Sequence, residues 1–209
     1  MKRLFLIFCC LAMLGATPGA AADAAAWQQR GNHFLLQGQF DQAINAFTEA
    51  VKLDPKLARA YHNRGYAYSK KKQLDQAIAD YSRAIQLQPG YAMAYKNRGL
   101  SFYLKRDYGR ASADFSQAIK IDPRYAEAYN FRGLTYASQG KFDPALADYN
   151  QALALNPKYA QAYQNRVLIH MFNRNYDQAW SDLHQAQSLG LKVDPELLQT
   201  LKRTSGRSK

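Results

Sequence analysis

The sequence predicts an all-α fold, an elongated superhelix of about five helix-pair repeats that a further helix closes at the C-terminal end. Proline recurs with a 34-residue period, and an aromatic residue recurs with the same period. Between them, apolar residues stand three or four apart, as on the buried face of an α-helix. The prolines are Pro55, Pro89, Pro123 and Pro157, and the aromatic residues are Trp27, Tyr61, Tyr95, Tyr129 and Tyr163.

The N-terminal segment, residues 1–22, has the pattern of an export signal. Two basic residues precede the apolar stretch 4–14, residues 17–19 (Thr-Pro-Gly) are expected to break any helix, and alanines 20–22 form a cleavage site before Asp23. The apolar stretch is shorter than the roughly 20 residues of a membrane-spanning helix. We therefore expect a cleaved signal peptide and a periplasmic or secreted protein, with an uncleaved inner-membrane anchor as the alternative.

The five repeats are predicted at residues 24–57, 58–91, 92–125, 126–159 and 160–193. Each of the first four contains the phrase aromatic-x-x-Arg-Gly-x-x-aromatic, followed by Ala-x-x-x-aromatic-x-x-Ala. Glycine and alanine at these places let two helix backbones approach closely, and proline ends the second helix. In the second repeat the helices are predicted at about 59–71 and 75–88.

The fifth repeat departs from the phrase. Val167 replaces the glycine, and Leu191 stands where proline is expected. A new helix is predicted from Pro195 to about Lys202, with an apolar stripe of leucines that covers the end of the array. Residues 194–209 therefore form the capping helix and a basic tail, of which residues 204–209 are expected to be disordered.

These repeats closely resemble the tetratricopeptide repeat family, and the resemblance covers about residues 24–193. It implies a right-handed superhelix in which the first helix of each repeat lines a concave groove. It also implies a scaffold or adaptor that binds a peptide segment of another protein and organises proteins of the bacterial envelope. Such a surface suits an extended or helical peptide.

The groove is predicted from the first helices, at positions 2, 5, 9, 12 and 13 of each repeat, counted from residues 24, 58, 92, 126 and 160. This surface mixes apolar side chains and amides with a few cations. Leucines on it have an alternative role, packing against neighbouring helices. The candidate groove residues are Asn32, His62, Tyr66, Met93, Lys96, Leu100, Tyr103, Asn130 and Leu134.

One subfamily holds the C-terminal carboxylate of its partner with lysines and asparagines. Asn32, Asn63 and Asn97 match the asparagine-type positions of that clamp, but Gln28 and Met93 occupy its lysine positions. Without those cations a carboxylate would be held poorly. The sequence therefore disfavours this clamp.

Arginine recurs at position 7 in all five repeats, and aspartate recurs at position 23 in four of them. The arginines could form an anion-binding ladder along the groove. Alternatively each could pair with an aspartate, which fits the rule that partly buried charges are retained when paired. Pairing within a repeat satisfies every aspartate and leaves only Arg30 alone, so we expect Arg98 within about 4 Å of Asp114.

Net charge is +12, and its excess lies in the second and third repeats, each of which carries +4. A basic edge there could dock acidic proteins, anionic lipid headgroups or anionic envelope polymer, and this is the alternative function that the sequence allows. Because we expect the protein to be exported, we do not expect this edge to bind nucleic acid. A basic edge that only aids solubility is the other interpretation. The edge residues are Lys70, Lys71, Lys72, Lys105, Arg106 and Arg110.

No catalytic or metal-binding pattern is found. Both cysteines, Cys9 and Cys10, lie inside the predicted signal peptide, so no disulfide, thiolate metal site or cysteine nucleophile is expected in the repeats. The four histidines lack metal-ligand spacing, and no nucleophile elbow, zinc helix or phosphate loop appears. We expect a protein that is not an enzyme and that has no cofactor, metal or small-molecule substrate.

Overall fold

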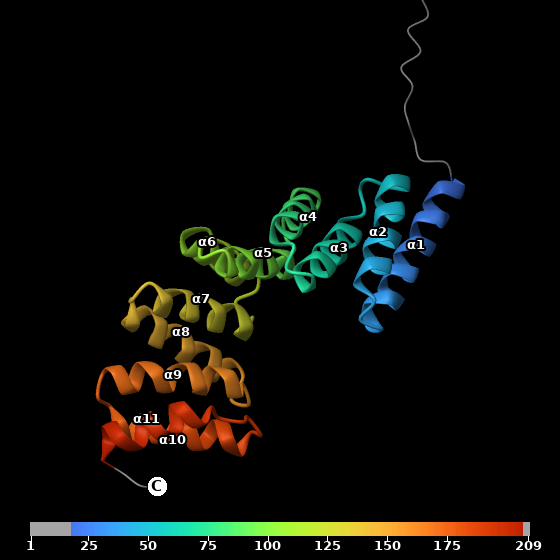
Figure 1. The fold of residues 1–209 in the computed structure, drawn as a ribbon. Coiled ribbons are helices and arrows are strands. Elements are labelled where there is room, and N and C mark those ends of the chain that lie inside the picture. The colour runs from blue at the N-terminus through green and yellow to red at the C-terminus, as the bar shows by residue number, and fades with distance from the viewer. Residues whose placement is uncertain (1–17, 207–209) are drawn as a thin grey trace, which may run out of the picture.

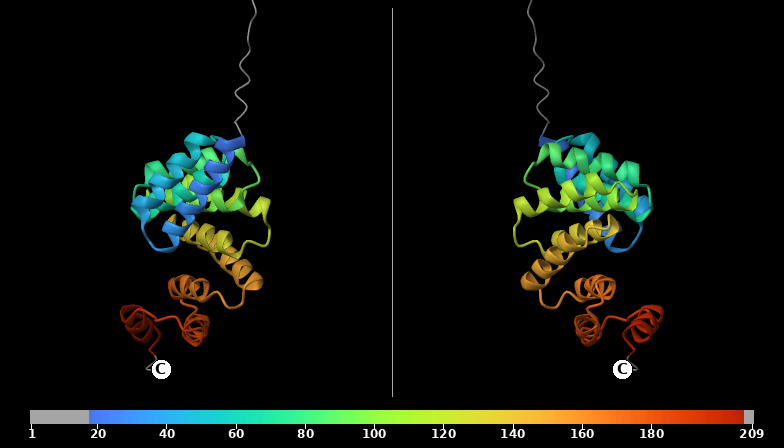
Figure 2. Two further views of the ribbon diagram at one scale, coloured as in Figure 1. Left: turned by 90° about the vertical axis from the view of Figure 1, so that its right-hand side faces the viewer. Right: turned by 90° about the vertical axis from the view of Figure 1, so that its left-hand side faces the viewer.

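A computed structural model describes residues 18–206, and over this range the chain forms eleven α-helices and no strand. Ten of the helices make five antiparallel pairs, and consecutive pairs pack against each other. The pairs follow one another along an open arc with the two ends far apart (Figure 1). The arc also winds out of the plane of that view (Figure 2). The predicted all-α superhelix is confirmed.

The first helices of the repeats are α1, α3, α5, α7 and α9, and the second helices are α2, α4, α6, α8 and α10. The first helices span Pro18–Leu36, Ala58–Lys70, Ala92–Leu104, Ala126–Ser138 and Ala160–Phe172. The second helices span Phe40–Leu53, Leu74–Leu87, Tyr108–Ile121, Phe142–Leu155 and Tyr176–Ser188. The helices predicted for the second repeat are therefore offset by one residue.

Each of the first four second helices ends two residues before a proline of the 34-residue series. A residue before proline is pushed out of the helical conformation, so the proline sets the end of each unit. The core contains many alanines and aromatic side chains, and the second helix of each of the first four repeats contributes a buried alanine and a buried aromatic residue to it. Its buried members include Ala43, Phe47, Ala77, Tyr81, Ala111, Phe115, Ala145 and Tyr149.

Helix α1 begins inside the predicted signal peptide. It starts at Pro18, within the sequence Thr-Pro-Gly, and continues through the alanines of the predicted cleavage site. Proline is compatible with the first turn of a helix, where its missing N–H has no intrahelical partner. The remainder of the predicted signal peptide, residues 1–17, lies outside the described residues.

The C-terminal cap, α11, spans Pro195–Ser205 and packs against α10. Leu201 is fully buried against Val167, Trp180 and Leu183, as the apolar stripe predicted. The helix is longer than expected, which corrects the prediction of disorder from residue 204. The indole N–H of Trp180 donates to Ser205 Oγ at 3.1 Å, and this bond ties down the last turn.

Candidate functional site

The concave side of the arc is formed by the first helices. Consecutive first helices contact one another directly along the whole array, from α1 with α3 to α7 with α9. In residues 18–206, the second helices of the first four repeats pack against the first helix of the next repeat, and no two second helices pack closely together. Helices that touch lie at the smaller radius of the superhelix, so α1, α3, α5, α7 and α9 line a continuous groove.

Large apolar side chains are exposed only on these first helices, among the side chains that the structure describes. They occupy positions 2, 9 and 13 of the repeat, which are groove positions predicted from the sequence. No second helix exposes a side chain of this kind within residues 22–206. The exposed residues are Leu36, Tyr66, Met93, Leu104, Leu168 and Phe172.

A hollow of about 570 Å³ lies between α1, α3 and α5. It brings together five of the predicted groove residues with two further asparagines and two leucines. Amides and one lysine form its polar part, and tyrosine, methionine and leucine form its apolar part. The lining residues are Asn32, Leu35, Leu36, His62, Asn63, Tyr66, Met93, Lys96 and Asn97.

A chain of hydrogen bonds crosses this hollow from the third repeat to the first. The Asn97 amide donates to His62 Nε2 at 2.9 Å, and the Nδ1–H of His62 donates to Asn63 Oδ1 at 2.9 Å. The Asn63 amide in turn donates to Asn32 Oδ1 at 2.8 Å. This direction of donation needs a neutral imidazole with its proton on Nδ1. Burial, the largest influence, lowers the pKa of His62, in agreement with a neutral ring.

The side chains that line the groove are different at its other end. A hollow of about 320 Å³ lies between α7, α8 and α9, and no charged residue lines it. Leu134, Leu168 and Phe172 supply its rim, and the rings of Phe142 and Phe172 are 4.3 Å apart between centroids. Between the two ends, a smaller hollow of about 180 Å³ includes Tyr66, Lys70, Leu100 and Leu104.

Tyr103 lies on the groove side of α5 and is partly buried. Its hydroxyl forms a hydrogen bond of 3.1 Å with Ser138 on α7, across two consecutive repeats. Its ring lies 5.5 Å from the ring of Tyr108 on α6. Tyr103 therefore links neighbouring repeats as well as facing the groove.

Asn130 corrects the predicted list of groove residues. It is 2% exposed, so its amide is not available to fix the register of a bound peptide. Its Nδ2 donates to the hydroxyl of Tyr159 at 3.2 Å, and its Oδ1 accepts from Asn165 at 3.0 Å. Asn130 holds consecutive repeats together and does not present a binding group.

A tyrosine also lies beside position 5 in two other repeats, although Lys96 still lines the hollow between α1, α3 and α5. The ring of Tyr91 lies 4.9 Å from that of His62, which is 5% exposed, and the ring of Tyr125 lies 5.9 Å from the Lys96 ammonium. These tyrosines occupy position 34, the last of their repeats, and burial raises their pKa values, to about 12 for Tyr159. The sequence analysis missed them, although tyrosine at residues 91, 125 and 159 is itself periodic.

The arginines at position 7 of repeats two to five have structural roles. Arg98 donates two bonds of 2.8 Å to the carboxylate of Asp114, which confirms the predicted pairing within a repeat. The same bidentate geometry joins the arginine and aspartate of the second, fourth and fifth repeats. These pairs are Arg64 with Asp80, Arg132 with Asp148, and Arg166 with Asp182.

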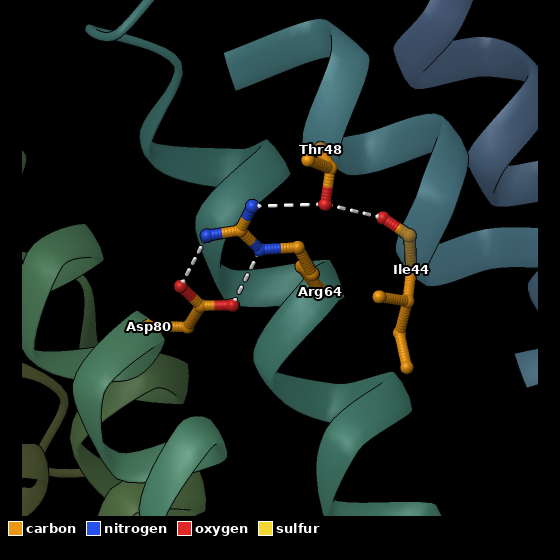
Figure 3. Close-up of polar contacts among 4 residues, drawn as sticks. All are labelled: Ile44, Thr48, Arg64 and Asp80. Carbon is orange, nitrogen blue, oxygen red and sulfur yellow. Dashed lines mark hydrogen bonds and ion pairs between the residues drawn. The ribbon is translucent and has the colours of Figure 1, made fainter. Parts of the chain in front are cut away.

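A third bond of each of these arginines was not foreseen. Arg64 Nη1 donates to Thr48 Oγ1 of the preceding repeat at 3.1 Å, and Thr48 donates to the Ile44 carbonyl (Figure 3). Ser82, Ser116 and Asn150 occupy the equivalent position for the later arginines. Each arginine therefore joins both helices of its own repeat to the repeat before it. Each guanidinium donates its bonds inside the fold and has its charge paired with a carboxylate, so these four arginines do not form an anion-binding ladder.

The basic edge is partly neutralised by aspartates. Lys71 pairs with Asp41 and Lys105 pairs with Asp75, each across to the preceding repeat. Arg110 pairs with Asp107 in the same turn. The other three edge residues form no ion pair within the part of the chain that the structure describes. These are Lys70, Lys72 and Arg106.

No group of acidic, histidine or cysteine side chains with a metal-binding arrangement occurs among the described residues. None of the helices described is both long and apolar enough to cross a membrane.

Two family models match the repeats. One, described as "TPR repeat", matches residues 31–72 and 101–140, and the other, described as "Tetratricopeptide repeat", matches residues 58–91 and 126–159. Together the matched segments cover more than half of the chain. No curated protein matches the sequence significantly.

Solved structures of similar arrangement are numerous. A crystal structure of MamA is 26% identical with a TM-score of 0.70, covering 77% of this chain and 94% of that one. The Pseudomonas aeruginosa protein pilF is 19% identical with a TM-score of 0.80, covering 90% and 89%, and shows the fold alone. The first TPR of Spaghetti (RPAP3), bound to the HSP90 peptide SRMEEVD, is 26% identical with a TM-score of 0.57, covering 57% and 95%.

Proposed function

The chain belongs to the tetratricopeptide repeat family, and from that premise we propose that it is an exported, non-catalytic scaffold that holds a peptide segment of an envelope protein in its concave groove. The fold is that of a protein-interaction scaffold. The Spaghetti (RPAP3) structure, a relative at 26% identity, contains a bound peptide. That relative supports a peptide as the ligand class here.

The observation that carries the proposal is the distribution of exposed apolar side chains. All six large ones in the described residues lie on first helices and face the groove side. Exposed apolar residues gathered on one face mark interaction sites in soluble proteins, whereas scattered ones do not. Burying such side chains against a partner supplies most of the binding free energy at an interface centre.

The groove is a better candidate than the basic edge for the main binding surface. Three of the six edge cations already have carboxylate partners in the fold, whereas the exposed groove side chains have no cover. Exposed charges are also screened by salt, so the edge is suited to raising the association rate and not to holding a partner tightly.

The proposal is tested by capture of partners in intact cells with two double variants. Tyr66→Ser with Phe172→Ser removes apolar groups from both ends of the groove, and both side chains are exposed enough for the fold to tolerate the change. Lys72→Glu with Arg106→Glu reverses two edge charges that form no ion pair in the described structure. Helicity measured by circular dichroism controls for folding.

We expect the groove variant to lose its crosslinked partner and the edge variant to retain it with weaker capture at low salt. The opposite ranking would favour the alternative function, binding of anionic envelope polymer or a membrane surface through the edge. Salt-sensitive binding of the purified protein to anionic vesicles, without any protein partner, would favour that alternative further. Turnover of a substrate that maps to groove residues would contradict the non-catalytic part of the proposal.

Export is proposed on the signal pattern of residues 1–22. Cleavage before Asp23 would leave this acidic residue at the start of α1, where a negative charge interacts favourably with the helix dipole. Ala24 is the first buried residue among the side chains described, so cleavage removes none of the described core. Protein purified from its native host should begin at or near Asp23 by intact mass. A mass that includes both cysteines would support the membrane-anchored alternative.

A further inference from the structure

From the contrast between the two ends of the groove, we infer that the bound segment is bipartite, with an acidic side chain that pairs with Lys96 and, a few residues away, a large apolar side chain that fills the hollow between α7 and α9. This inference rests on the proposed function and names the chemistry of the partner. Two observations support the inference: the environment of Lys96 and the absence of charged side chains from the lining of the hollow between α7 and α9.

Lys96 is a half-buried cation whose ammonium has no carboxylate within salt-bridge distance in the described structure. The interior arginines of repeats two to five have bidentate aspartates, and Lys96 differs from them in this respect. Burial lowers the pKa of Lys96, and the exposed Glu127 acts on it only through space. A cation that has lost part of its hydration is stabilised by a hydrogen bond to a carboxylate of the ligand.

The surroundings of Lys96 favour an anion over a neutral group. Asn63 and Asn97 line the same hollow, and each uses one amide N–H in the hydrogen-bond chain described above. An asparagine amide carries two N–H groups, so each has a second one to donate. With the ammonium, these donors form a set that matches a carboxylate. The neutral His62 beside them adds no competing negative charge.

The hollow between α7 and α9 favours an apolar side chain. Its lining includes Leu134, Phe142, Leu168, Ile169 and Phe172 and no charged side chain. At about 320 Å³ it has room for one large side chain of a peptide, and its lining is mainly apolar, with Ser138, Tyr149 and Asn165 as its polar members. Phe172 and Leu168 are 68% and 55% exposed, so an incoming apolar side chain would bury surface that the fold leaves open.

The separation of the two features sets the spacing of the bound segment. Packed helices are about 8–10 Å apart, so one and a half repeats along the first helices is on the order of 15 Å. An extended chain advances about 3.3 Å per residue. We therefore expect roughly four or five residues from the acidic residue to the apolar one.

The test uses fluorescein-labelled peptides with amidated C-termini and the chain from Asp23 onward. Each peptide holds one Glu and one Phe in a Ser/Gly background, with two to seven residues between them and in both orders. Binding is measured by fluorescence anisotropy. Matched peptides replace Glu with Gln or Phe with Ala, and one further peptide has a free C-terminal carboxylate in place of Glu.

We expect one order and one range of spacings to bind best, and either replacement in that peptide to weaken binding about tenfold. Lys96→Gln should abolish the difference between the Glu and Gln peptides while keeping the difference between Phe and Ala. Phe172→Ser should do the reverse. Glu127→Gln, which removes the nearest competing carboxylate, should strengthen binding of the Glu peptide.

Four results would overturn the inference. Equal binding of Glu and Gln peptides would remove the acidic half, and equal binding of Phe and Ala peptides would remove the apolar half. Preference for the free C-terminal carboxylate over an internal Glu would replace the acidic side chain with a chain end. Absence of binding by every peptide would overturn it as well, while groove-dependent capture in cells would still decide the proposed function independently.

Discussion

Gly99 offers a sharp test of how the repeats pack. A Cβ placed on this residue would lie 3.0 Å from Phe115 Cε1 and 3.2 Å from the carbonyl oxygen of Ala111. Phe115 is fully buried and the carbonyl belongs to a helix backbone, so neither can move freely. Gly99→Val should cost about 1–3 kcal/mol through overpacking, reduced by a few tenths because valine forms helix better than glycine.

The fifth repeat shows how the fold accommodates the larger side chain. Val167 stands at the glycine position there, and Leu183 replaces the aromatic residue that faces it in the other repeats. Phe115→Leu should therefore relieve the clash with a valine at residue 99. Alone, it should cost about 1–2 kcal/mol through lost packing. Together, the two changes should cost at least about 1 kcal/mol less than the sum of the single costs.

The assay is urea unfolding followed by circular dichroism for the parent, both single variants and the double variant. Gly109→Val is the matched control, because a Cβ at Gly109 meets only an Asp107 oxygen at 3.8 Å. Since repeat arrays can lose two-state behaviour, midpoints are compared together with the slopes. Additive effects of Gly99→Val and Phe115→Leu within about 0.5 kcal/mol would refute the packing argument.

Three further predictions follow from the turns, the ion pairs and the buried imidazole. Lys72 has a φ of 61°, and Gly38 at the equivalent position of the first repeat has a φ of 70°. Lys72→Gly should therefore raise the free energy of unfolding by about 0.5–1 kcal/mol, and an unchanged value in urea unfolding would contradict this. Asp114→Asn should lower the free energy of unfolding by about 2 kcal/mol. This is less than for a fully buried pair, because Arg98 keeps some exposure to solvent. A change below about 0.5 kcal/mol would contradict the structural role of the pair. Because burial lowers the pKa of His62 below its value in the unfolded chain, the unfolded state binds more protons, and stability should be lost as pH falls from about 7 to about 5. His62→Gln should flatten that pH dependence, and an unchanged slope would assign it to other groups.

Local periodicity was sufficient to predict the fold. The 34-residue spacing of proline places the end of each second helix, and apolar spacing places the helices within one residue in the second repeat. The Arg–Asp pairs could also be predicted, because Arg98 and Asp114 lie in one repeat and pairing within a repeat satisfies every aspartate of position 23. Each of these inferences needs only residues that are close in sequence.

Contacts between repeats could not be predicted in the same way. Tyr159 covers Asn130 from 29 residues away, and whether it reaches depends on how far each repeat is rotated against the next. That rotation follows from the packing of whole helix faces and is not encoded in any short motif. The hydroxyl at Thr48, which receives the third bond of Arg64, was missed for the same reason.

The groove was predicted in outline and corrected in detail. Positions 9 and 13 carry Tyr66, Leu168 and Phe172, which are exposed as predicted. The prediction that position 5 presents an exposed amide was wrong for Asn130, which is buried. Helical periodicity indicates which side of a helix a residue occupies, but it does not indicate what the next turn of chain places over it. The lack of a carboxylate within salt-bridge distance of Lys96 became visible only when the positions of the described carboxylates were known.

The central claim is that the concave face holds the partner, and a photo-crosslinking scan tests it most directly. A photoreactive residue is placed in turn at Phe172 and Leu104 in the groove, at Arg83 on the outer helix α4, and at Lys72 on the basic edge. We predict that the groove positions crosslink to one and the same protein in intact cells and that Arg83 does not. Crosslinks that arise from Lys72 or Arg83 while Phe172 and Leu104 give none would contradict the account.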